Sequence, residues 1–66
     1  MPTYQITYTD PQHKVQDSEV IIMKNLGAAK RSARHHAPDG NQYIEIRDLM
    51  DKKLSLYDQD EGWQDV

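Results

Sequence analysis

The sequence predicts an α+β domain in which an antiparallel sheet of about four strands carries one α-helix on one face. Several short segments alternate apolar and polar residues with a period of two, which is typical of strands with one buried face. One segment in the middle of the chain instead repeats apolar residues every three or four positions, as an amphipathic helix does. The expected element order is therefore β-β-α-β-β, an arrangement of the α+β class.

The chain has room for a single domain, spanning residues 1–66. A chain of this size buries only about 60% of the surface that it exposes when unfolded, so its core is small. It contains no cysteine, which excludes disulfides, thiolate metal ligands and cysteine nucleophiles. The first residues lack the features of a signal peptide, and no apolar run approaches the ~20 residues that cross a bilayer. We therefore expect a cytoplasmic protein without a membrane partner.

The first strand is expected at Thr3–Thr9. Tyr4, Ile6 and Tyr8 alternate there with threonine and glutamine, so one face is apolar and the other is polar. The next residues, Asp10–Lys14, end the strand because proline has no amide hydrogen to donate and aspartate favours turns.

The second strand is expected at Ser18–Met23. Both of its faces are apolar, since Val20 and Ile22 lie on one face and the residues between them lie on the other. Such a pattern favours a central strand, or a strand whose second face is partly covered. We expect Val20 and Ile22 to face the core.

The helix is expected to begin at Leu26 and to end at about His36. Asn25 precedes it and is suited to accept a hydrogen bond from an amide of the first turn. Pro38 ends it, because the residue before a proline avoids the helical conformation. The apolar stripe at helical spacing consists of Leu26, Ala29, Ala33 and Ala37. Its alanines are small enough to let the helix lie close to the sheet.

Two more strands are expected at Asn41–Leu49 and Lys53–Gln59, joined by a hairpin. The inward-facing residues are expected to be Ile44, Ile46, Leu54 and Leu56. The outward-facing residues are expected to be Tyr43, Glu45, Arg47, Ser55 and Tyr57. The last residues are compatible with a short final strand, in which Trp63 closes one end of the core.

Positive charge is concentrated on the predicted helix, although the whole protein has a net charge of −3. With the apolar stripe turned to the sheet, Lys30 and Arg34 form one exposed ridge, and Arg31 and His35 form the next. Basic residues near a helix C-terminus complement its dipole, which explains part of the pattern. The other interpretation is that the four side chains dock on an anionic or carboxylate-bearing surface, which arginine can bind with two hydrogen bonds.

A series of short motifs runs from Leu26 to Asp65. Ala-Lys-Arg on the helix is followed by a small residue and Ala33, and Gly40 precedes the next strand. Ile-Glu-Ile, Leu-x-Leu-Tyr and Trp-x-Asp then follow in order. In this order and spacing, the motifs resemble a family of small phage-encoded anti-CRISPR proteins, the ninth-named inhibitors of type I-F systems.

The resemblance implies a non-enzymatic inhibitor that acts in the cytoplasm of a bacterial host. It implies binding to the repeated backbone subunits of an RNA-guided CRISPR surveillance complex, where the inhibitor blocks target DNA. Lys30 and Arg31 match the basic pair on the family's helix. The family's next basic helix residue falls at His35, with Arg34 beside it as a substitute. The chain departs from the family after Tyr57, where acidic residues replace basic ones that a family member can carry.

Two further surfaces are candidates for binding. Tyr43 and Tyr57 are expected to project from the open sheet face beside Arg47, and tyrosine and arginine are enriched at the centres of interfaces. The same residues also suit ordinary cross-strand pairing. The acidic end of the chain is either a mimic of DNA phosphates or a solvated turn, and consists of Asp58, Asp60, Glu61 and Asp65.

No catalytic or metal-binding arrangement is expected. His35 and His36 diverge by about 100° on a helix and do not easily share a metal ion, and no nucleotide-binding glycine pattern occurs. We therefore expect a binding protein without a cofactor or a small-molecule substrate. Two alternatives remain open. One is a small module that binds nucleic acid directly but weakly, with salt-dependent binding through several phosphate contacts. The other is a homodimer rather than a monomer.

Overall fold

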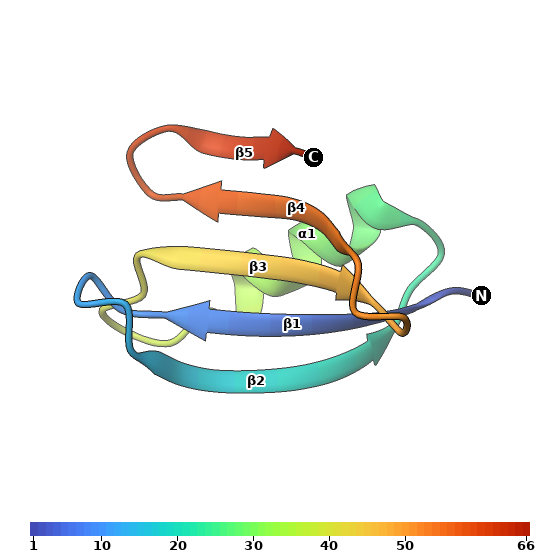
Figure 1. The fold of residues 1–66 in the computed structure, drawn as a ribbon, viewed down its shortest axis with the longest axis horizontal. Coiled ribbons are helices and arrows are strands. Elements are labelled where there is room, and N and C mark those ends of the chain that lie inside the picture. Colours follow the sequence, from blue (N-terminus) through green and yellow to red (C-terminus); the bar gives the residue numbers. More distant parts are fainter.

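The computed structural model describes residues 1–66 and contains a five-stranded antiparallel sheet with one helix on one face (Figure 1). Its elements are β1 (Thr3–Thr9), β2 (Val15–Ile22), α1 (Leu26–His36), β3 (Tyr43–Asp48), β4 (Lys53–Asp58) and β5 (Gly62–Asp65). The α+β class is confirmed. The sheet has one strand more than the expected four because the final residues pair with β4.

The strands lie in the order β2-β1-β3-β4-β5. β1 and β2 form a hairpin, and β3, β4 and β5 form a meander, so most neighbours in the sheet are also neighbours in the sequence. α1 connects the outer strand β2 to β3, and it lies behind the sheet in the view of Figure 1. The helix is neither long enough nor apolar enough to cross a membrane.

The core lies between α1 and the central strands. Ile6, Ile44 and Ile46 are fully buried, and Ala29 and Ala33 of the helix lie against this layer with 0% and 1% of their surface exposed. The predicted faces of β1, β3 and α1 are therefore confirmed. The alanines matter because a larger side chain at either position would hold the helix farther from the sheet.

The predicted ends of the helix are also confirmed. The Asn25 side-chain oxygen accepts a hydrogen bond from the Ala28 amide at 2.9 Å, which satisfies one of the free amides of the first turn. The last helical residue is His36, and Ala37 before Pro38 has an extended conformation with ψ of 130°.

The predicted face of β2 is wrong. Val20 and Ile22 are 65% and 63% exposed, whereas Ile21 is partly buried and packs against the core. Ile21 lies opposite Tyr4 of β1, so these two residues share the face that the helix covers. Since both faces of β2 are apolar, alternation with a period of two did not distinguish them. The register of the β1–β2 hairpin decides which face of β2 packs against the helix.

The predicted face of β4 is wrong as well. Ile46 pairs with Ser55 and Arg47 with Lys53, so Leu54 is an extra residue at a β-bulge. Ser55 and Tyr57 therefore turn toward the helix and are buried, while Leu56 pairs with Glu45 on the open face. Leu54 still packs against the core, as does Trp63 of β5.

One buried hydroxyl links β1 to the edge of the sheet. The Tyr8 side chain is 1% exposed, and its hydroxyl donates a hydrogen bond to Glu19 of β2 at 2.7 Å. Burial raises the pKa of Tyr8, and the hydrogen bond to Glu19 raises it further. His36 Nδ1 lies 3.5 Å from the other Glu19 oxygen, so this carboxylate also connects β2 to the end of α1.

Candidate functional site

Four basic side chains of α1 lie exposed to solvent, and one of them, His36, lies near Glu19. The other three are Arg31, Arg34 and His35. We call them the basic face. None of the ion pairs in the structure includes any of the three. Together they line a shallow, open depression of about 360 Å³. The helix thus presents concentrated positive charge without an acidic partner from the same chain.

An aromatic ring orients one member of the basic face. The Arg34 guanidinium carbon lies 5.0 Å from the centre of the Tyr57 ring, a distance typical of cation–π contacts. Tyr57 is itself buried and packs on Trp63, with 4.9 Å between the ring centres. The contact restricts Arg34 while leaving its side chain exposed, which reduces the entropy that a partner would have to remove on binding.

Lys30 does not belong to this exposed group, so the prediction of a free Lys30–Arg34 ridge is wrong. Its side chain is 19% exposed, and Nζ lies 2.6 Å from Asp65 Oδ1. The same ammonium group lies 5.4 Å from the centre of the Trp63 ring. Its charge is therefore compensated within the molecule, by an acid and an aromatic ring of β5.

The pairing of β5 with β4 produces this arrangement. Asp65 lies opposite Ser55, and Trp63 lies opposite Tyr57, so both β5 residues are on the face that the helix covers. The Ser55 hydroxyl donates a hydrogen bond to Asp65 at 2.8 Å. Asp65 is thus occupied within the chain, in contrast to the expectation that it contributes to a free acidic surface.

Replacing Asp65 with asparagine is expected to loosen β5. Lys30 first, and Ser55 second, lower the pKa of Asp65 in the folded protein. Because this folded-state pKa lies below the unfolded value, the contribution to stability is present above the ordinary aspartate pKa of about 3.9 and is lost as pH falls through the folded value. We expect Trp63 fluorescence of the wild-type protein to report this acidic transition and Asp65→Asn to lack it.

Asp39→Asn is a matched control, since it removes an exposed carboxylate outside this contact. It should keep the acidic transition of the wild type. Identical fluorescence titrations for wild type and Asp65→Asn would contradict the assigned contact.

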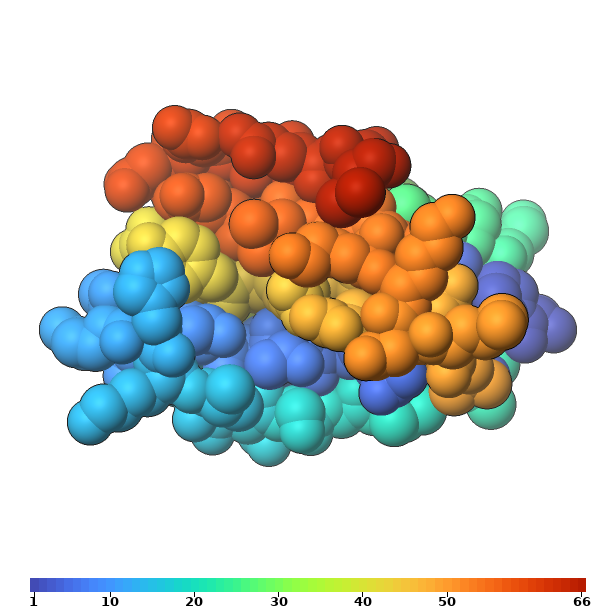
Figure 2. Space-filling view, viewed as in Figure 1, coloured from blue at the N-terminus to red at the C-terminus, as the bar shows by residue number.

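The second candidate surface is only partly assembled. Tyr43 lies on the open face as expected, where it stacks on His13 with 5.0 Å between the ring centres. Tyr57 is 7% exposed and faces the helix, so its predicted place beside Tyr43 and Arg47 is wrong. Figure 2 views this open face, with the β1–β2 turn in light blue and the β3–β4 turn in orange at opposite ends.

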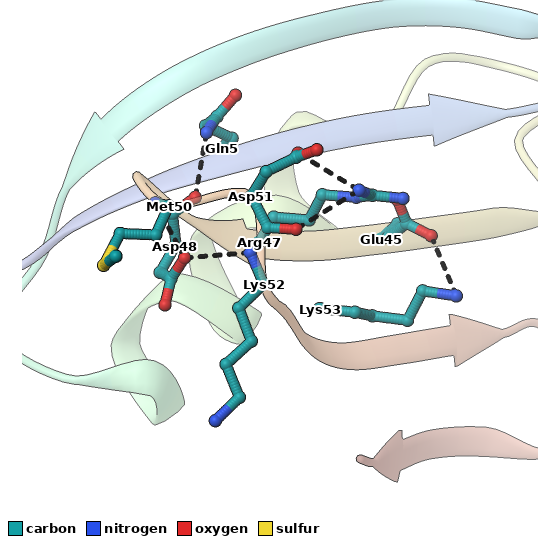
Figure 3. Close-up of polar contacts among 8 residues, drawn as sticks. All are labelled: Gln5, Glu45, Arg47, Asp48, Met50, Asp51, Lys52 and Lys53. Atoms are coloured by element: carbon teal, nitrogen blue, oxygen red, sulfur yellow. Dashed lines mark hydrogen bonds and ion pairs between the residues drawn. The ribbon is translucent and has the colours of Figure 1, made fainter.

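Arg47 is held in an ion-pair network on the same face (Figure 3). Its Nε lies 2.5 Å from Glu45 and its Nη1 lies 3.1 Å from Asp51. Lys53 Nζ lies 3.5 Å from the other Glu45 oxygen. The hydrogen bonds with Glu45 and then Asp51 raise the pKa of Arg47. These contacts connect β3 to the β3–β4 turn, so Arg47 has a structural role in this hairpin.

The turn itself is held by Asp48. Its carboxylate accepts hydrogen bonds from the amides of Met50 and Lys52 at 2.9 and 3.0 Å, and its carbonyl accepts one from the Gln5 side chain at 2.8 Å (Figure 3). Asp51 has a positive φ of 65°, a conformation that aspartate tolerates better than most residues. The open face around Arg47 is thus defined by internal contacts of the chain.

No protein-family model matches this chain, and no curated protein or solved structure matches it. No three histidine, cysteine, aspartate or glutamate side chains come together in a way that could hold a metal ion. Its function is therefore inferred from the exposure and charge of its own side chains.

Proposed function

We propose that the protein is a non-enzymatic inhibitor that binds a protein partner through the basic face of α1. The partner in this proposal is the repeated backbone of a type I CRISPR surveillance complex in a bacterial host, and the effect of binding is to keep target DNA out. The observation that carries the proposal is the exposure of Arg31, Arg34 and His35 without an acidic partner in the chain.

The clustering of uncompensated positive charge on one helix supports a binding role, because the other unpaired cations, Lys14, Lys24 and Lys52, lie in three separate connections. Lys30, Arg47 and Lys53 each lie within ion-pair distance of a carboxylate of the same molecule. The basic face has no such contact, although acidic residues outnumber lysine and arginine by 11 to 8 in the chain. Charges on an exposed helix contribute little to stability, whereas arginine suits recognition of carboxylates through paired hydrogen bonds.

The resemblance of the chain from Leu26 to Asp65 supports the choice of partner. The family's basic pair falls on Lys30 and Arg31, of which only Arg31 is free. We therefore assign binding to Arg31, Arg34 and His35, while Lys30 fixes the position of β5 through Asp65. The acidic residues of the β4–β5 turn are exposed, and the proposal gives them no role in binding.

Reversal of two charges tests this proposal. Arg31→Glu with Arg34→Glu is expected to weaken binding to a purified type I-F surveillance complex by about 100-fold, since two charge-assisted contacts contribute roughly 1.4 kcal/mol each. The melting temperature should remain nearly unchanged because both side chains are exposed. Biolayer interferometry with the immobilised complex measures the affinity, and a target-DNA binding assay measures the inhibition.

Lys14→Glu with Lys52→Glu is the matched control, because it makes the same change in net charge at two exposed turn residues. This variant should bind like the wild type. Equal losses for both variants, or no association of the wild-type protein with the complex, would refute the proposal. Binding of DNA alone, with a steep salt dependence, would instead identify a nucleic-acid-binding module.

A further inference from the structure

β2 forms a free edge of the sheet along one side of the molecule (Figure 1). The Met23 amide donates to the Pro2 carbonyl beside β1, so the backbone of Ile21, two residues earlier, also points toward β1. The Ser18 amide instead donates a hydrogen bond to the Asp17 carboxylate at 2.8 Å. Alternation along the strand therefore directs the amide and carbonyl groups of Val20 and Ile22 outward, where no strand pairs with them.

The two halves of this edge differ in character. Asp17 and Glu19 make the first half acidic, and the Asp17 carboxylate already occupies the outward amide of Ser18. The second half is apolar, with Val20 and Ile22 65% and 63% exposed. Exposed sheet edges are usually protected by lysine, proline or a bulge. The Val20–Ile22 half has none of these, so it offers a strand that is open to pairing.

We propose that this half of β2 is a self-association surface, on which β2 of a second copy adds as an antiparallel strand. The two sheets then become continuous across a twofold axis perpendicular to them. This surface is separate from the basic face of α1 and does not depend on the function proposed for it.

The charge pattern excludes two registers of the pairing. An axis through Ser18 would place Asp17 opposite Glu19 of the second copy, and an axis through Glu19 would place the two Glu19 side chains opposite each other. Like charges in opposite positions destabilise paired strands. An axis through Ile21 avoids both conflicts, and it leaves the hydrogen bond between Asp17 and the Ser18 amide intact.

The same register pairs the exposed apolar side chains with one another. Val20 lies opposite Ile22 of the second copy on the open face, and Ile22 lies opposite its Val20. These positions have their backbone groups directed outward, so each pair exchanges both of its hydrogen bonds. On the face that the helix covers, Ile21 lies opposite Ile21 of the second copy. A second copy is thus the occupant that this edge fits, because its apolar half is complementary to itself.

The contact is short, and we expect a reversible dimer that forms at high protein concentration. Interfaces smaller than about 1,200 Å² are characteristic of weak complexes. Because the axis is perpendicular to the sheet, both helices lie on the same side of the continuous sheet. The basic faces of the two copies therefore remain exposed together.

Sedimentation velocity of the full chain from micromolar to millimolar concentration tests this inference. The wild-type protein should shift from monomer to dimer, and Val20→Lys with Ile22→Lys should raise the dissociation constant by at least about 30-fold, because lysines then lie opposite lysines. Val15→Lys is the control, since Val15 is equally exposed on the same strand but outside the paired half. It should dimerise like the wild type.

Hydrogen exchange of the wild-type protein provides a second measurement that needs no variant. The Val20 and Ile22 amides should become slower to exchange as concentration rises, while the Gln16 amide should not. A protein that stays monomeric throughout the range, or a dimer that Val15→Lys weakens as much as the double variant, would overturn the inference. A second experiment adds a peptide with alternating lysines to the protein. If the protein stayed monomeric and the Val20 and Ile22 amides exchanged more slowly only in the presence of this peptide, the inference would also be overturned.

Discussion

Replacing Ile46 with alanine is expected to lower the free energy of unfolding by about 2–5 kcal/mol. Ile46 is fully buried in β3, directly opposite Ile6 of β1, which is also fully buried. The substitution leaves a cavity in a layer that only one helix covers. Small domains have roughly 0.05–0.15 kcal/mol of stability per residue, so a loss of this size removes a large share of the total.

Urea denaturation followed by circular dichroism measures this loss. Leu49→Ala is the matched control, because it removes the same number of carbon atoms at a position that is 65% exposed. Its effect should stay within about 0.5 kcal/mol. If both variants lost the same stability, the assignment of Ile46 to the centre of the core would be wrong.

Replacing Ala33 with leucine is expected to destabilise the domain by about 1–3 kcal/mol. Ala33 is 1% exposed and lies between the helix and the sheet, so a longer side chain forces the helix outward. The displacement also separates Lys30 from Asp65 and Trp63. We therefore expect a lower urea midpoint together with a change in Trp63 fluorescence before unfolding begins.

Arg31→Leu distinguishes overpacking from the mere presence of leucine on the helix. Arg31 is exposed on the same helix, and leucine there favours the helical conformation about as well as arginine does. Its urea midpoint should stay close to that of the wild type. A parallel drop in both variants would show that the alanine contact is not the cause.

The sequence predicted those elements whose local signals agree with one another. α1 combines an asparagine N-cap, a stripe of small apolar residues and a proline stop, and each of these signals indicates the same boundaries. β1 and β3 carry one apolar and one polar face, so their orientation followed from alternation alone. At these places the residue pattern and the packing require the same arrangement.

The faces of β2 and β4 depended on features that alternation does not contain. In β2 both faces are apolar, and pairing with β1 places Ile21 under the helix. In β4 the bulge at Leu54 reverses the order, so that Ser55 and Tyr57 replace Leu56 in the core. The buried serine is stabilised by its hydrogen bond to Asp65, a residue of a different strand.

The basic face was predictable in part. Helical spacing placed Arg31, Arg34 and His35 on the solvent side, and they lie there. The same reasoning failed for Lys30, because its partner Asp65 is 35 positions away and reaches it only through β5. A long flexible side chain at the margin of an exposed face can bend toward a nearby acid, and no local sequence pattern predicts this contact.

The order of the strands has a consequence for how the chain folds. The β1–β2 hairpin and the β3–β5 meander are each local, and they join along a single seam between β1 and β3. Closing that seam unites Ile6 with Ile46, about forty positions apart, and distant contacts of this kind slow folding. Cutting the connection between α1 and β3 would yield two fragments that contact each other only along this seam and through the helix packing. Such a pair of fragments could serve as a split reporter, in which the rate of reassembly is measured.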